Sequence, residues 1–195
     1  MFSSSRCRIK LIKRCLRLDN IESILDVGCG VGYTANALGK VFHGASVLGI
    51  DISIDAIEYA QSKFPMIDFQ VRAASPDEDA FGLFDAIFCF EFYPFTRNCD
   101  PEFQASMIKW LMKMVSNDGN LLIYQKWNQQ HSLSAVWGEV VELCRPELDL
   151  TVAKLPHPKL PVSLPPFLSW ALSAMACVLG REGFRHVVQV RRIKK

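Results

Sequence analysis

The sequence predicts an α/β fold of the doubly wound type: a mostly parallel sheet of six or seven strands with helices on both faces. Short β-type runs alternate with helical patterns through most of the 195 residues, which is typical of successive βαβ units. Residues 84–90 form an almost unbroken apolar run, as expected for a central strand covered on both faces. A glycine-rich turn leads from the first predicted strand into a helix.

The first 20 residues are expected to form a basic helix. Residues 1–18 contain six basic residues and no acidic one. Ile9, Ile12 and Leu16 recur at helical spacing and would pack on the sheet. Organelle-targeting segments have a similar composition, so targeting stays open as an alternative. We favour the helix because cleavage would leave almost nothing before the first strand.

Residues 21–126 show the most regular alternation of strands and helices. After the second strand, apolar residues at helical spacing predict a helix, with Ser53 as its N-cap. Another helix is predicted at residues 101–116, and Asn117, Asp118 and Gly119 then form a turn into the fifth strand. The five strands are predicted at residues 23–27, 46–50, 68–73, 84–90 and 121–125.

The pattern is looser after residue 127. A helix is predicted at residues 133–144, and residues 146–166 hold six of the ten prolines, which excludes a central strand or a helix interior there. Residues 167–182 return to a helical pattern, and residues 183–195 contain a last strand candidate at 185–190. At this length we expect a single domain over residues 1–195.

Composition narrows the classes of protein. The seven cysteines are an odd number without a CxxC pair, which favours free thiols in a reducing, cytoplasmic setting over disulfides or a metal site. The longest nearly apolar stretch, residues 167–180, is shorter than the roughly 20 residues of a membrane span. Residues 19–180 hold 10 basic and 19 acidic groups, which argues against a domain-wide nucleic-acid footprint.

The strongest local feature is the stretch ILDVGCGVGYTANAL at residues 24–38. A dinucleotide site requires a glycine where this chain has Tyr33. Asp26, two residues before the first glycine, would repel a pyrophosphate and attract an ammonium group. S-adenosylmethionine carries an ammonium and a sulfonium and has no phosphate, so the loop favours this cofactor.

The same residues resemble the first motif of the class I S-adenosylmethionine-dependent methyltransferases, a hydrophobic residue followed by Asp or Glu and then x-Gly-x-Gly-x-Gly. Leu25 to Gly32 match it completely, and VLGIDIS places Asp51 at the end of the second strand, where the family has its second motif. The resemblance covers about residues 20–126 and implies a Rossmann-like fold. It implies that Asp51 accepts both ribose hydroxyls and that Ile52 packs on the adenine. The cofactor-binding residues expected are Asp26, Gly28, Cys29, Gly30, Gly32, Asp51, Ile52, Ala74 and Phe90.

Two departures from the family pattern stand out. Where the family often has an Asp for the adenine amino group, this chain has Ala73 and Ala74, so adenine recognition would fall to main-chain groups, to Ser75 or to Asp77, or would be weaker. The family commonly ends in an antiparallel strand pair. Only one such strand is evident after Gly183, and its partner is either residues 148–155 or missing.

The methyl acceptor is expected to be a small, partly hydrophobic molecule. The candidates for catalysis are Glu91, Tyr93 and His131, near the ends of the fourth and fifth strands. The Asn/Asp-Pro-Pro-Tyr signature of nucleobase and glutamine methylation is absent, which argues against a nucleic-acid substrate. The apolar residues of the segment 127–182, with Trp170 among them, would contact the acceptor, a membrane surface or a partner.

Two alternatives remain at this stage. The chain would also fit a cofactor-binding interaction protein without catalytic activity, because the adenine-binding Asp is missing. An RNA or protein methyltransferase would use the basic ends as an arm, and its substrate binding would depend steeply on salt.

Overall fold

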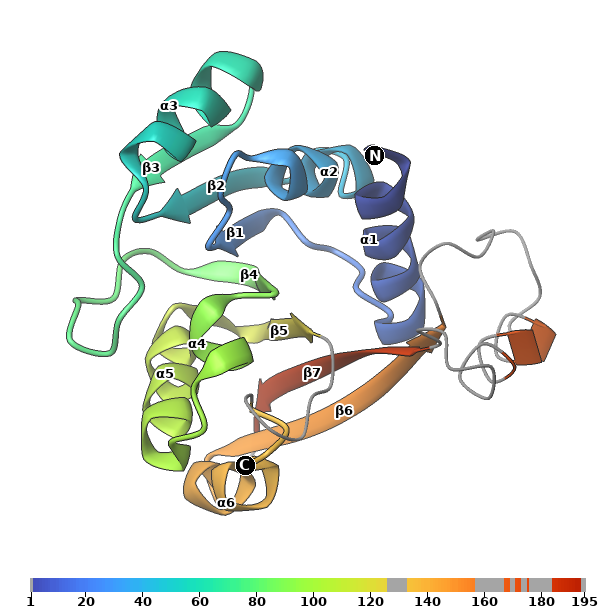
Figure 1. The fold of residues 1–195 in the computed structure, drawn as a ribbon, viewed down its shortest axis with the longest axis vertical. Helices are drawn as coiled ribbons and strands as arrows, with labels where there is room; N and C mark the ends of the chain where they lie inside the picture. Colours follow the sequence, from blue (N-terminus) through green and yellow to red (C-terminus); the bar gives the residue numbers. More distant parts are fainter. Residues whose placement is uncertain are drawn as a thin grey trace.

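A seven-stranded sheet forms the centre of the protein in its computed structural model (Figure 1). The structure describes residues 2–125, 133–156, 167–168, 171–172, 175 and 184–193. The strands are β1 (Ser23–Val27), β2 (Ser46–Asp51), β3 (Asp68–Val71), β4 (Phe84–Phe90), β5 (Val115–Gln125), β6 (Leu148–Pro156) and β7 (Phe184–Arg192). Their order is β3-β2-β1-β4-β5-β7-β6, with the first five parallel and β7 antiparallel to both neighbours. The predicted fold class is confirmed.

Helices cover both faces of the sheet. The helices are α1 (Phe2–Leu16), α2 (Tyr33–Val41), α3 (Ile54–Lys63), α4 (Tyr93–Arg97), α5 (Pro101–Lys113) and α6 (Trp137–Cys144). Side chains of α1, α2 and α3 share one buried cluster, and those of α4, α5 and α6 share another. Strand β4 supplies both, since Ala86 and Phe88 enter the first cluster while Ile87 and Cys89 enter the second. This alternation explains its almost unbroken apolar sequence.

The order in which strands are added to the sheet changes side between β1 and β4. From β1 the chain proceeds to β2 and β3 on one side, then returns to β4 and β5 on the other. Ligands of open α/β sheets bind outside the carboxyl ends of the strands at such a switch point. The glycine-rich loop follows β1 at this edge, so the fold itself indicates where a ligand would bind.

The α1 helix is confirmed, and it packs on the sheet as predicted. Ile9 and Ile12 are fully buried, and Leu16 packs against the same cluster. Figure 1 shows α1 lying beside α2 and crossing to the β6–β7 side of the sheet. The predicted N-cap of α3 is also confirmed, because the Ser53 side chain accepts a hydrogen bond from the Ala56 N–H at 3.2 Å.

Strand β5 begins earlier than predicted. It starts at Val115, which pairs with Phe84 of β4. The next pair is Ala86 with Asn120, so β5 has more residues than β4 between these two pairs and forms an irregularity there. The predicted turn at Asn117 to Gly119 therefore lies inside β5, and α5 ends at Lys113 instead of residue 116.

Three other boundaries differ from the prediction. Strand β3 ends at Val71 instead of residue 73, because the β2 ladder beside it ends at Asp51. Helix α6 begins at Trp137 instead of residue 133. The last strand is longer than predicted and pairs with Leu148–Pro156, which answers the question of its partner.

Parts of the carboxyl-terminal prediction lie outside the described residues. Of the predicted helix at 167–182, residues 167, 168, 171, 172 and 175 are described, and all of them are helical. Residues 157–166, Trp170 and His131 are outside the described part. Among the described helices, none has the length and apolar character needed to cross a membrane.

Candidate functional site

The loop after β1 turns sharply through three glycines. Gly28, Gly30 and Gly32 have φ angles of 70°, 51° and 81°, in the left-handed region that favours glycine. The N–H groups of Gly28 and Cys29 both donate to the Ile50 carbonyl, at 2.9 and 3.0 Å. The loop is thus fastened to the end of β2, and α2 begins directly after Gly32.

The space around the three glycines differs. A Cβ on Gly28 would come within 2.6 Å of the Phe92 ring, and one on Gly32 within 2.7 Å of the Phe69 ring. These two glycines are needed for packing inside the protein. A Cβ on Gly30 would meet no atom within 4 Å, so Gly30 is the place where a ligand can approach the main chain closely.

Asp51 holds the loop in shape. Its Oδ2 accepts a hydrogen bond from the Gly30 N–H at 2.8 Å, and its Oδ1 accepts one from the Ser53 N–H at 3.0 Å. A carboxylate oxygen can accept more than one hydrogen bond. Asp51 therefore keeps acceptor capacity next to the open space at Gly30.

Asp26 is a buried acid whose Oδ2 has no hydrogen-bond partner among the described residues. It lies in the middle of the sheet, in register with Gly49 of β2 and Phe88 of β4. Burial, together with the charge of Asp51, raises the pKa of Asp26 to about 8. The sequence argument treated Asp26 as an anion, but in the structure it is largely protonated at pH 7. A strongly perturbed acid beside a cleft loop is typical of a functional site.

Cys29 contributes packing and main-chain hydrogen bonding to this loop. Burial, Asp26 and Asp51 raise the pKa of its thiol to about 12, so the side chain stays neutral and unreactive. Its Sγ lies so close to Gly49 that a Cβ there would come within 3.0 Å of it. Cys29 stands between Gly28 and Gly30 in this loop, and its predicted contact with the cofactor stays a prediction.

The predicted adenine side of the site is open. Ile52 follows Asp51 and is 72% exposed, which leaves its apolar side chain available to an aromatic ring. Ala73 is exposed, and Ala74 packs partly against the core. Ser75 and Asp77 hydrogen-bond to each other, with Oγ and Oδ2 3.4 Å apart.

Glu91 and Tyr93 lie where β4 leaves the sheet. Glu91 has a φ of 48°, a conformation that costs energy in a residue other than glycine, and its N–H donates to the Tyr124 carbonyl at 2.8 Å. Both side chains are exposed at this edge of the sheet. The ring of Phe90 stacks on Phe88 with centroids 5.6 Å apart and contacts Tyr124 at 5.4 Å, so it forms a wall of the core at the strand end.

Two polar residues near this edge escaped the sequence analysis. Gln125, the last residue of β5, is fully buried, and within the described part of the chain neither atom of its amide has a hydrogen-bond partner. The Arg8 guanidinium of α1 lies 5.0 Å from the centroid of the Tyr124 ring, and its Nε is buried without a partner. Both had a signal in the sequence. Gln125 closes an apolar strand, and Arg8 is four residues before the inward-facing Ile12.

Comparison with known proteins identifies a family. Residues 24–119 match the profile of a methyltransferase domain. Over 115 residues the chain is 30% identical to 2-methyl-6-phytyl-1,4-hydroquinone methyltransferase of a Synechocystis species, covering 55% of this chain and 33% of that protein. Over 73 residues it is 37% identical to the mitochondrial ubiquinone biosynthesis O-methyltransferase of Saccharomyces cerevisiae, covering 35% and 23%. The matches to curated relatives span less than half the length of those proteins.

Solved structures share the fold at low sequence identity. Magnesium protoporphyrin IX methyltransferase from Synechocystis, solved with bound S-adenosylmethionine, superposes with a TM-score of 0.62 at 16% identity, over 97% of this chain and 80% of that one. A TehB-like S-adenosylmethionine-dependent methyltransferase from Corynebacterium glutamicum gives a TM-score of 0.59 at 20% identity, over 98% and 88%. The complete first motif, the methyltransferase-domain match over residues 24–119 and this fold together support a class I S-adenosylmethionine-dependent methyltransferase.

Proposed function

We propose that this protein transfers a methyl group from S-adenosylmethionine to a small, partly hydrophobic acceptor and releases S-adenosylhomocysteine. One observation carries the proposal: Asp26 is a buried acid with a vacant acceptor atom, behind a loop whose Gly30 is open to a ligand. A buried acid without a partner destabilises the fold, so its presence calls for a role outside packing.

The cofactor would lie across the carboxyl ends of β1 and β2. Its ammonium group would be attracted to Asp26, and the cation would lower the pKa of that acid. The remaining acceptor capacity of Asp51 would receive the ribose hydroxyls, and the exposed Ile52 would cover one face of the adenine. Ala74 would border the adenine through its main chain.

The acceptor would bind where β4 and β5 end. When bound, S-adenosylmethionine supplies an electrophilic methyl group that a nucleophile attacks in line with the leaving sulfur. The protein has to align the acceptor and exclude water. Glu91 and Tyr93, and His131 outside the described residues, are the candidates to take a proton from an acceptor hydroxyl. The phytyl chain in the name of the Synechocystis relative agrees with a partly hydrophobic acceptor.

The proposed function is tested by measuring cofactor binding first and methyl transfer second. Calorimetric titration with S-adenosylhomocysteine is expected to show binding, and Asp26→Asn should weaken it at least about tenfold, as for the loss of one charged partner. Asp149→Asn, an exposed acid of β6, serves as the matched control. Turnover is then measured with prenylated phenols, hydroquinones and small amines. Binding of a nicotinamide dinucleotide instead would refute the assignment, and cofactor binding without turnover on a broad panel would refute catalysis.

A further inference from the structure

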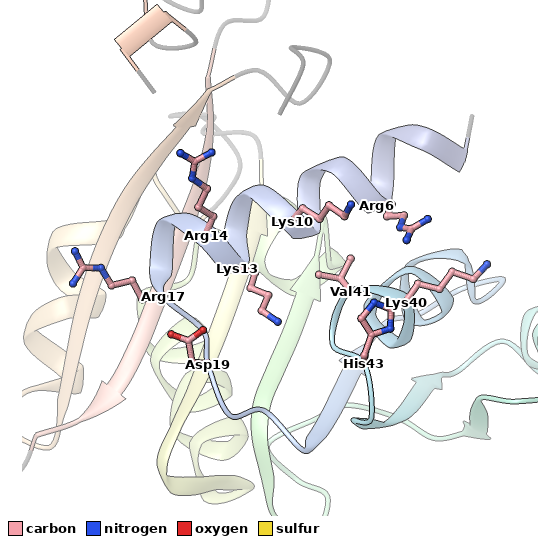
Figure 2. A pocket seen from close by; sticks show the side chains of 9 residues that line it. All are labelled: Arg6, Lys10, Lys13, Arg14, Arg17, Asp19, Lys40, Val41 and His43. Atoms are coloured by element: carbon pink, nitrogen blue, oxygen red, sulfur yellow. The ribbon is translucent and has the colours of Figure 1, made fainter. Parts of the chain in front are cut away.

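A hollow lies between α1 and the carboxyl-terminal end of α2, away from the glycine-rich loop. It has a volume of about 390 Å³. We call it the α1–α2 basic cleft and define it by Arg6, Lys10, Lys13, Arg14, Arg17 and Lys40. His43 also lines it, and Asp19 is the one acidic residue in its lining. Figure 2 shows the side chains of α1 and of the end of α2 around this hollow.

The charges gather here because of the pattern of α1. Its apolar Ile9 and Ile12 face the sheet, so the basic residues at helical spacing project from the outer face. Helix α1 has no acid in its first turn, and its last turn holds Lys13 and Arg14. Among the described residues, no carboxylate forms an ion pair with a side chain that defines the cleft. Apart from Asp19, the charged side chains that line the cleft are all cations, which makes the cleft favourable for anions.

The cleft is separate from the proposed cofactor site. Helix α2 begins beside the glycine-rich loop at Tyr33 and ends beside the cleft at Val41, so the two sites lie at opposite ends of one helix. The proposed cofactor has no phosphate and needs no such cluster of cations. An anion that binds in the cleft must therefore be a different ligand.

We propose that the α1–α2 basic cleft docks the protein on an anionic phospholipid surface. Four to eight lysine and arginine residues on one face of an amphipathic helix are typical of binding to anionic lipid head groups. Single-stranded nucleic acids instead bind where exposed aromatic rings accompany the positive charge. Phe42, which stands between the lining residues Val41 and His43 in the chain, is only 3% exposed, and the Lys13 ammonium lies 4.8 Å from the centroid of its ring. The observations therefore favour a lipid surface over a single-stranded nucleic acid.

Vesicle flotation tests the docking with the full chain and without cofactor. The protein should float with phosphatidylcholine vesicles that contain about a third phosphatidylglycerol, and not with pure phosphatidylcholine, because each basic residue near an anionic surface adds attraction. Added salt should release it, since the contacts are exposed to solvent. The double variant Lys10→Glu/Arg14→Glu should lower the partition coefficient at least about tenfold.

A matched control keeps the net charge of the variant the same. Lys63→Glu/Lys113→Glu changes exposed lysines on α3 and α5 and should float like the wild type. Circular dichroism and S-adenosylhomocysteine titration on each variant test whether the fold and the cofactor site are intact. A failure of the docking proposal can therefore be told apart from a failure of the proposed function. Equal flotation of the two double variants would overturn the proposal. So would tighter binding of single-stranded RNA than of vesicles, with the RNA binding lost in the cleft variant.

Discussion

Oδ2 of Asp51 accepts a hydrogen bond from the main-chain N–H of Gly30 at 2.8 Å, across the gap between β2 and the loop after β1. The residue proposed to bind the ribose thus also fixes the loop that the cofactor would contact. Cofactor binding and the shape of the empty site depend on the same carboxylate.

Replacing Asp51 should therefore affect binding and stability together. We expect Asp51→Ala to weaken S-adenosylhomocysteine binding by about 2 kcal/mol or more, and to lower the free energy of unfolding by about 1–2 kcal/mol through the two lost main-chain hydrogen bonds. Asp51→Asn keeps one oxygen acceptor, so its affinity and its free energy of unfolding should lie between those of the wild type and Asp51→Ala. Calorimetric titration and denaturant unfolding measure the two effects. An Asp51→Ala protein with unchanged affinity would exclude the ribose role.

Cofactor binding should release a proton from Asp26 near neutral pH. The acid has a pKa of about 8 in the empty protein and is therefore mostly protonated at pH 7. An ammonium group beside it stabilises the carboxylate, so close to one proton should leave on binding. Titrations at pH 7 in buffers of different ionisation enthalpy count the protons. The Asp26→Asn variant should release fewer, and a wild-type count of zero would contradict the arrangement.

The same acid should make the empty protein less stable as the pH rises. The pKa of Asp26 is raised from 3.8 to about 8 in the folded protein. Below about pH 4 the acid is protonated in both the folded and the unfolded state and does not affect stability, and between about pH 4 and pH 8 the folded state progressively loses stability. Asp26→Asn removes this loss, although its buried amide costs roughly 1–3 kcal/mol. Relative to the wild type, the variant should gain stability as the pH rises from about 4 to about 8, and it should be the more stable protein at pH 9. Urea unfolding across this range gives the comparison, and parallel curves would show that Asp26 does not titrate as described.

Substitutions at Gly28 and Phe92 should have coupled effects on the free energy of unfolding. Alanine at Gly28 meets the Phe92 ring and must adopt a φ of 70°, so we expect a loss of about 2–4 kcal/mol in the free energy of unfolding. Phe92→Ala removes the ring but leaves the backbone strain. In a double-mutant cycle, the double variant should therefore be more stable than the sum of the single effects predicts. Strict additivity would mean that the ring simply moves aside.

Gln125 can be compared with Gln104, another fully buried glutamine. The amide nitrogen of Gln104 donates to the carbonyls of Pro94 and Asn98, whereas neither amide atom of Gln125 has a partner in the part of the chain that the structure describes. Gln104→Leu should lower the free energy of unfolding by about 1–3 kcal/mol, while Gln125→Leu should be neutral or stabilising. If the Gln125 amide orients the acceptor, its variant should turn over more slowly despite this stability. An unaffected rate would limit Gln125 to packing.

Local patterns were sufficient to locate the parallel strands, although not to set the limits of β3 and β5. Strands such as Ser23–Val27 and Phe84–Phe90 are short, apolar and bounded by turn residues, so their positions follow from the sequence. The first motif, with Asp26 and Gly30, and the second motif, with Asp51, lie at one edge because parallel strands end together. The roles proposed for these residues rest on the family resemblance and remain predictions.

The remaining features depend on contacts between distant residues. The start of β5 at Val115 is set by its pairing with Phe84, and the limits of β6 are set by residues such as Arg192, which faces Leu148. The protonation of Asp26 follows from its burial between two strands, which no local pattern reveals. For the same reason the unpartnered amide of Gln125 became evident only in three dimensions.

The place of β7 in the sheet has a consequence for how this protein is made. It lies between β5 and β6, and within the described strands β6 joins the sheet through β7 alone. A ribosome delivers β6 before the strand that anchors it, so the nascent chain must carry an open β5 edge and an unattached β6 until Phe184–Arg192 has emerged. During this interval the open β5 edge can pair with strands of other chains, so the nascent protein is exposed to aggregation and offers chaperones a target.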